Sequence, residues 1–447
     1  MKRMTVLLIA AGAALLASCA SVPRDAGLGD VQQAVAARTN QPVECVADDA
    51  RLQALLADEL TADEAVAIAV ARNPRLQVTL AELGIARAEL IEASTIANPV
   101  LELEVRIPGE PYRPYELRLA QSLIQLIQLP RRRAIGRAAF AAAQMRVSAN
   151  VLRFGAGVRA SYFDAIAATQ HVAQSRTIVE AARTAAEVAI KQHAAENITD
   201  LDLENEQALY EQAKLDLARA ERQLLVAREA LQRNLGFRDA ALQWRLPERF
   251  PELPAAERDQ QQLEQLAAQQ RLDLAIATRE VEIARRGVPL ARLAALGEVI
   301  VDGHYEREPS GEHTVGPGIE FPIPIFNTGR AARTRAEAQF LRARSALSAI
   351  EYESSSQLRA ARAVLEEARA RVEYYRDVLL PRRRRIVELT KLEHNAMLIG
   401  IFQLLQARQN EAEAQSGFIE AQREYWSARA NLDRVLQGIA DDTTGGH

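Results

Sequence analysis

Residues 145–190 read MRVSANVLRFGAGVRASYFDAIAATQHVAQSRTIVEAARTAAEVAI, and no proline occurs between Pro130 and Pro247. Small and apolar residues recur here at alternating spacings of four and three: Val147, Val151, Phe154, Val158, Ser161, Ala165, Ala168, Val172, Ser175, Val179, Ala182, Ala186 and Ala189. A mean repeat of 3.5 keeps one seam of a helix against a partner helix in a left-handed supercoil. A helix from Arg131 to Glu196 would be about 100 Å long. The stretch therefore predicts the wall of a hollow coiled-coil structure rather than the core of a globule.

The long helix is expected to turn and run back along itself. The sequence Glu196-Asn197-Ile198-Thr199-Asp200 breaks the pattern, and Thr199 followed by Asp202 is typical of a capped helix start. The return helix carries its own seam at Ala213, Leu217, Ala220, Leu224, Ala227, Leu231 and Leu235. Gly236 then provides a suitable end to this helix.

The second half of the chain repeats this plan. Two short motifs recur at the same offset: Asn73-Pro74-Arg75-Leu76 with Arg271-Leu272-Asp273-Leu274, and Ile85-Ala86-Arg87 with Ile283-Ala284-Arg285. We expect two repeats, 58–236 and 260–437, joined by a connector at 237–259. Each would hold a helix, a β-hairpin (99–124 and 297–323) and a helical hairpin (131–236 and 330–437). We expect Pro381 to interrupt the long helix of the second repeat, and the tail 438–447 to be disordered.

The two predicted β-hairpins have one apolar face each. Leu101, Leu103 and Val105 alternate with charged residues, and the same period of two returns at Tyr115-Leu119, Val299-Tyr305 and Val315-Phe321. Such strands can cross a membrane only in a closed barrel, because lipid cannot pair open edges. Four strands are too few to close, so a membrane location requires several copies. The alternative is a soluble hairpin packed on the helices.

The N-terminus has the pattern of a bacterial lipoprotein signal. Lys2 and Arg3 precede an apolar segment, and Leu16-Ala17-Ser18-Cys19 resembles a lipobox. Residues 1–18 would then be removed, and Cys19 would carry the lipid. The alternative is a plain secretory signal with an incidental cysteine. We expect residues 19–57 to form a tether with little structure.

Composition argues against several other classes of protein. The net charge of −4 is too mild to indicate a nucleic-acid partner. No GxSxG, HExxH or phosphate-loop motif is present, which favours a protein without enzymatic activity. Beyond the signal, Met145 and Met397 are the only methionines, so no soft-ligand metal pathway is apparent and no cofactor is expected. The positive charge is almost entirely arginine, since the chain has only Lys2, Lys191, Lys214 and Lys391.

Several motifs resemble the TolC-type outer-membrane efflux channels, and specifically their lipoprotein branch. The matching motifs are Leu60-Thr61-Ala62-Asp63-Glu64-Ala65, Asn73-Pro74-Arg75-Leu76, Ala97-Asn98-Pro99, Pro322-Ile323-Pro324-Ile325-Phe326-Asn327-Thr328-Gly329-Arg330 and Gly400-Ile401-Phe402-Gln403-Leu404-Leu405-Gln406-Ala407-Arg408. They stand in the family's order over about residues 58 to 437.

The resemblance implies a mainly α fold with a small membrane β part. Duplicated helical hairpins would form a periplasmic α-barrel, and four strands per protomer would contribute to a twelve-stranded barrel of a homotrimer in the outer membrane. It further implies docking to a periplasmic adaptor and an inner-membrane pump, and passive export of heavy-metal ions or drugs. The alternative is a periplasmic coiled-coil scaffold or adaptor lipoprotein without a pore.

In this family, acidic rings often line the closed periplasmic end. The matching positions are Asp202 and Asn205 in the first repeat and Gln403 and Gln406 in the second; Asp202 has the alternative role of a helix cap. The tip histidines His193 and His394 occupy matching places and could bind metal or sense pH, although ordinary surface residues at the adaptor contact are the expected reading. No metal site is expected.

Overall fold

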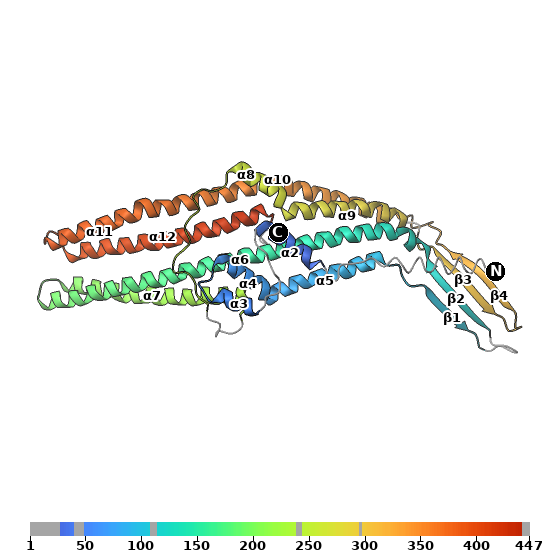
Figure 1. The fold of residues 1–447 in the computed structure, drawn as a ribbon, viewed down its shortest axis with the longest axis horizontal. Helices are drawn as coiled ribbons and strands as arrows, with labels where there is room; N and C mark the ends of the chain where they lie inside the picture. The colour runs from blue at the N-terminus through green and yellow to red at the C-terminus, as the bar shows by residue number, and fades with distance from the viewer. Residues whose placement is uncertain (1–26, 40–48, 108–113, 238–243, 295–296, 440–447) are drawn as a thin grey trace. The chain divides into compact units, whose positions relative to one another are not determined.

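The computed structural model describes the chain except for residues 1–26, 40–48, 108–113, 238–243, 295–296 and 440–447, so Cys19 and Cys45 lie outside the described residues. The elements are α2 (Leu28–Thr39), α3 (Asp49–Leu56), α4 (Ala62–Arg72), α5 (Pro74–Ser94), β1 (Val100–Val105), β2 (Tyr115–Ser122), α6 (Leu123–Ala194), α7 (Asp200–Leu235), α8 (Gln260–Gln270), α9 (Leu272–Ala294), β3 (Ile300–Arg307), β4 (His313–Glu320), α10 (Arg330–Tyr374), the π-helix η1 (Tyr375–Leu379), α11 (Leu380–Asn395) and α12 (Ile401–Leu436). The predicted mainly α class with four strands is confirmed (Figure 1).

The chain divides into two compact units. Unit 1 holds the β-sheet and the helix segments next to it, from Met1–Ala34, Thr79–Ser148 and Leu272–Tyr352. Unit 2 holds the rest of both helical hairpins, including their tips, from Val35–Val78, Ala149–Arg271 and Glu353–His447. Among the described residues, no helix is both long enough and apolar enough to cross a bilayer.

In unit 1 the two β-hairpins join into one antiparallel sheet in the order β1-β2-β3-β4. Strand β2 pairs with β3, so Leu103, Leu117, Tyr305 and Val315 form a single row across all four strands. This face is open to its surroundings: Leu103 is 62% exposed and Val315 is 75% exposed. The outer edges of β1 and β4 have no partner strand within the sheet.

The described part of the expected N-terminal tether is helical, so that prediction is wrong for residues 28–39 and 49–56. Val31 and Val35 lie one turn apart on α2 and are both buried. Leu52 on α3 joins the main core of unit 2, which includes Leu60 and Ile68. Burial of these apolar side chains orders short helices that have little propensity of their own.

A helix ends directly before the Asn73-Pro74 motif, and the start of α6 differs from the prediction. Helix α4 begins with a capping box, in which Thr61 and Glu64 bond each other's backbone N–H, and it ends at Arg72. Helix α6 begins at Leu123, directly after β2, so Pro130 lies inside it rather than at its start. A proline there forfeits one backbone hydrogen bond, which a helix of this length tolerates.

The second long helix is interrupted by a π turn and not by Pro381. Buried residues on α10 follow the spacing three and four at Leu358, Ala361, Leu365, Ala368 and Val372. The next buried residue, Leu380, comes eight positions later, and Val387 follows after seven. The π turn at Tyr375–Leu379 absorbs the one extra residue, and Pro381 stands in the first turn of α11 where it costs little.

A partly buried ion cluster joins the connector of unit 2 to its helices. The Glu257 carboxylate accepts hydrogen bonds from Tyr425 Oη at 2.6 Å, from Arg429 at 2.9 Å and from Arg369 at 3.2 Å. Burial and this hydrogen bond raise the pKa of Tyr425 to about 12. The connector between the repeats is therefore fixed to both α10 and α12.

Candidate functional site

The tips of the two helical hairpins are built alike in unit 2. Glu196 and Met397 are the only non-glycine residues of the described chain with positive φ, and both have a φ of 58°. Their backbone N–H groups bond the carbonyls of His193 and His394 at 2.8 and 2.9 Å. The same turn thus closes both hairpins, which gives the sequence duplication a direct structural counterpart.

The tip histidines His193 and His394 have different partners. His193 Nε2 lies 2.6 Å from Asp200 Oδ1 at the start of α7, whereas His394 Nδ1 lies 3.3 Å from the carbonyl oxygen of Ile399. Each histidine bonds within its own turn. Across the residues that the structure describes, no three His, Cys, Asp or Glu side chains come together in a way that would hold a metal.

Asp202 forms the helix cap that its sequence position predicts. The Thr199 hydroxyl accepts the Asp202 N–H at 3.2 Å, and the Asp202 carboxylate accepts the Thr199 N–H at 3.1 Å. Asn205 and the counterparts Gln403 and Gln406 are exposed. A carboxylate therefore stands at the start of α7, and an uncharged amide stands at the same place on α12.

Glu206 is a candidate that the sequence analysis missed. It is only 4% exposed, and burial together with the negative charge of Asp202 raises the pKa of its carboxyl group. The seam of α7 extends back by one heptad from Ala213 to this position, and the counterpart on α12, Ala407, is buried. The raised pKa favours the neutral acid in the folded state. Glu206 therefore contributes most to the free energy of unfolding in acid, and this contribution falls as the pH rises through that pKa.

Each repeat also uses the residue at its helix break to hold the end of its return helix. The Asn73 side-chain amide donates to the carbonyls of Arg233 and Asn234 at 3.0 and 2.8 Å, at the end of α7. In the second repeat, Arg271 donates to the carbonyl of Val435 at 3.4 Å, near the end of α12. The duplicated motif at 73 and 271 therefore has one role in both halves.

Asn73→Ala is expected to destabilise the protein by about 1–3 kcal/mol, because the buried Asn73 amide no longer donates to the carbonyls of Arg233 and Asn234. Thermal unfolding followed by circular dichroism at 222 nm would measure this as a lower Tm. Asn205→Ala removes an exposed amide and serves as the control, with an expected change within about 0.5 kcal/mol. Equal effects of the two substitutions would contradict the role of Asn73.

The second face of the sheet in unit 1 is charged. Arg118 on β2 pairs with Asp302 on β3 at 3.1 Å and with Glu320 on β4 at 2.9 Å, and lies 3.8 Å from Glu102 on β1. Gly318 leaves the space that Asp302 occupies, since a Cβ there would lie 2.6 Å from its carboxylate. One arginine thus links all four strands, and the sheet has one charged face and one apolar face.

The second half of the chain matches a protein-family model. Residues 263–438 match the family described as outer membrane efflux protein. No curated protein matches the sequence.

Solved structures resemble nearly the whole chain. A membrane protein from Pseudomonas aeruginosa is 22% identical with a TM-score of 0.70, covering 84% of this chain and 93% of that one. The CmeC outer membrane channel of Campylobacter jejuni is 16% identical with a TM-score of 0.67, covering 86% and 87%. The open MtrE outer membrane channel of Neisseria gonorrhoeae is 19% identical with a TM-score of 0.63, covering 86% and 90%. At these identities the likeness establishes the fold.

Proposed function

We propose that the chain is the outer-membrane channel of a tripartite efflux system, a role supported by the match of residues 263–438 to the outer membrane efflux protein family. It acts as a passive conduit from the periplasm to the exterior for small toxic solutes such as heavy-metal ions or drugs. A periplasmic adaptor and an inner-membrane pump supply the connection and the energy, and a lipid on Cys19 adds an anchor.

The observation that carries this proposal is the sheet of unit 1. It has an exposed apolar face, a charged opposite face and two unpaired edges. Lipid cannot pair open edges, and a wide apolar face is unfavourable in water. Three copies joined edge to edge give a closed barrel with the charged faces inside. A scaffold or adaptor without a pore gives no reason for a sheet with opposed apolar and charged faces.

Conductance of the purified full-length protein in planar lipid bilayers tests this function. We expect stable ion-conducting steps and, on unheated gels, a band at the mass of a trimer that shifts on heating. Absence of conductance from protein that is correctly assembled in the outer membrane would overturn the channel.

Asp202→Ala is expected to raise single-channel conductance, because a carboxylate near the closed tip is removed in every copy. The substitution also removes a helix cap, at a cost of about 1 kcal/mol. Thr199→Ala is the matched control, since it removes the same cap and keeps the carboxylate. An equal rise in both variants would assign Asp202 to capping alone.

A further inference from the structure

The helix turns that adjoin the sheet of unit 1 are rich in arginine. The segments are 87–94 of α5, 123–137 of α6, 282–294 of α9 and 330–337 of α10. Together they contain eleven arginines and four glutamates and neither lysine nor aspartate, which leaves seven positive charges in excess. We call the arginines of these four segments the arginine collar.

Contacts within unit 1 join the four segments into one surface. Pro130 and Arg131 of α6 line a shared hollow with Arg286 of α9. Arg292 of α9 lies 4.0 Å from Glu337 of α10. The Arg132 guanidinium donates to the Glu92 carbonyl of α5 at 3.4 Å. The collar therefore runs across neighbouring helices.

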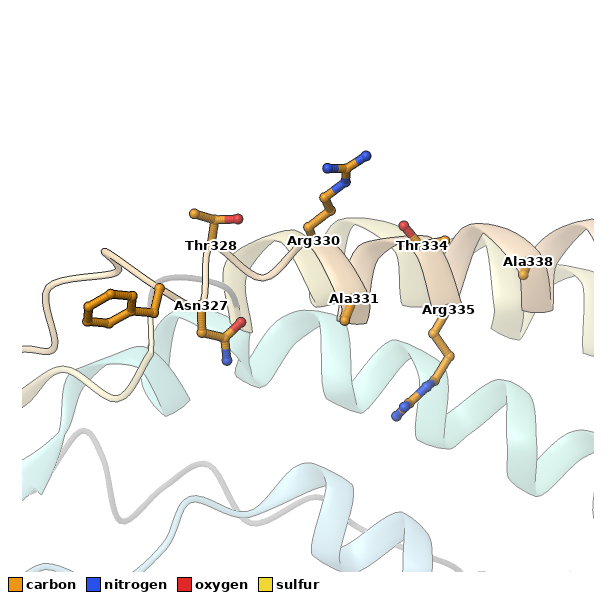
Figure 2. A pocket seen from close by; sticks show the side chains of 8 residues that line it. Asn327, Thr328, Arg330, Ala331, Thr334, Arg335 and Ala338 are labelled. Atoms are coloured by element: carbon orange, nitrogen blue, oxygen red, sulfur yellow. The ribbon is translucent and has the colours of Figure 1, made fainter.

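The local carboxylates do not neutralise the collar. Glu282 is shared between Arg285 at 2.8 Å and Arg286 at 2.5 Å, and Glu337 is taken by Arg333 at 2.8 Å. Within the described part of the chain, Arg131, Arg330 and Arg335 form no ion pair, and all three are exposed. Figure 2 shows Arg330 and Arg335 leaving α10 in different directions, away from the helix. These three guanidinium groups are available to an anionic partner.

An exposed apolar segment separates the collar from the sheet. After β4, Phe326 is 99% exposed, and Ile323 and Ile325 are also exposed. On α6, Leu123 and Ile127 are exposed and precede Arg131. The four residues from Ile127 to Arg131 correspond to about 6 Å along the helix. The order from sheet to helix is thus an apolar face, an apolar border and then fixed positive charge.

This order matches that of a bilayer, in which hydrocarbon is followed by headgroup phosphates. Arginine binds phosphate through two parallel N–H groups and keeps its charge in every environment. Its aliphatic stem packs on apolar surface while the guanidinium reaches the polar layer. A protein partner offers no reason for fixed positive charge to follow directly on the exposed apolar face of the sheet.

We propose that the arginine collar binds the headgroup phosphates of anionic phospholipids in the periplasmic leaflet of the outer membrane. The proposal rests on the proposed function, because it takes the sheet of unit 1 to lie in that membrane. In this proposal the arginines bind lipid and take no direct part in export.

Binding of phosphatidylglycerol to the full-length protein in a nonionic detergent tests the collar. The probe is fluorescent phosphatidylglycerol followed by anisotropy, with unlabelled phosphatidylglycerol and phosphatidylcholine as competitors. We expect phosphatidylglycerol to compete at least about 10-fold better. The triple variant R131Q/R330Q/R335Q should lose affinity by about five-fold for each arginine, or about 100-fold in all.

Two further variants distinguish lipid binding from altered folding. R131K/R330K/R335K keeps the charge and should retain most of the preference for phosphatidylglycerol. R342Q/R344Q/R359Q removes three exposed arginines farther along α10 and should leave binding unchanged. Equal competition by the two lipids, or equal loss in this control, would overturn the proposal.

Two other measurements on the glutamine variant distinguish lipid binding from channel function and from contact with a second copy of the chain. Conductance that persists in the glutamine variant, together with lost lipid preference, supports the collar independently of transport. A collar that contacts a second copy instead of lipid predicts that the glutamine variant falls apart into subunits while lipid preference is retained, and this outcome overturns the proposal.

Discussion

Leu103→Arg is expected to abolish assembly of the protein in the outer membrane. Leu103 stands in the middle of β1, in the row with Leu117, Tyr305 and Val315, on the exposed apolar face. An arginine on the lipid face near the bilayer midplane costs about 2–4 kcal/mol in a membrane β-barrel. Each copy in an oligomer adds the same cost. Unheated gel migration and membrane fractionation should show that the trimer band is lost.

Thr314→Arg is the matched control for this substitution. Thr314 is exposed on β4 and stands in the neighbouring row with Glu104, Glu116 and Glu306, so its side chain belongs to the charged face. An added arginine there meets carboxylates and water, and assembly should continue. Arg118 is unsuitable as a control because it links all four strands. If both substitutions have the same effect, the assignment of the apolar face to lipid is wrong.

Deletion of Asp377 is expected to leave the second hairpin folded. The π turn at Tyr375–Leu379 carries one residue more than the seam requires, so removing that residue should convert it to ordinary α-helix. Leu380 would then follow Val372 after seven positions and remain buried. Asp377 is exposed and its ion pair is with the adjacent Arg376. Thermal unfolding at 222 nm should show a Tm within a few degrees of the unaltered protein.

Deletion of Glu366 should instead unfold the hairpin. Glu366 is likewise exposed and paired with one arginine, Arg362, at 2.7 Å. No surplus residue is available there, so the helix beyond the deletion turns by about 100° relative to its partner. Ala368 and Val372 would leave the seam, and loss of such buried groups costs several kcal/mol. Similar Tm values for the two deletions would contradict the account of the π turn.

The interruption of the second long helix is predicted at Pro381 from the sequence, but lies in the π turn of the structure. Proline is the residue known to end a helix, so the pattern favours it. The extra residue that rotates the seam has no chemical signature of its own. It becomes visible only when the buried positions on both sides, Val372 and Leu380, are known.

The candidate residues at the tips show a similar division. The cap formed by Thr199 and Asp202 depends on residues three apart, so it could be predicted and is confirmed. Glu206 could have been found by extending the seam of Ala213 back by seven residues. Seams are recognised by their apolar residues, and glutamate is charged. The seam of α7 is therefore read from Ala213 onward and not from Glu206.

The sequence by itself determined the coiled-coil seams, the helix caps and the alternation of the strands, because each depends on neighbours within about seven positions along the chain. It also determined the duplicated plan, because the two motifs recur at one fixed offset. The tertiary structure decided that β2 pairs with β3, that Arg118 joins four strands and that the arginine-rich segments of α5, α6, α9 and α10 contact one another. The pairing of β2 with β3 and the ion pairs of Arg118 with Asp302 and Glu320 join residues separated by more than a hundred positions. They depend on how the elements pack in space, and no local spacing records it.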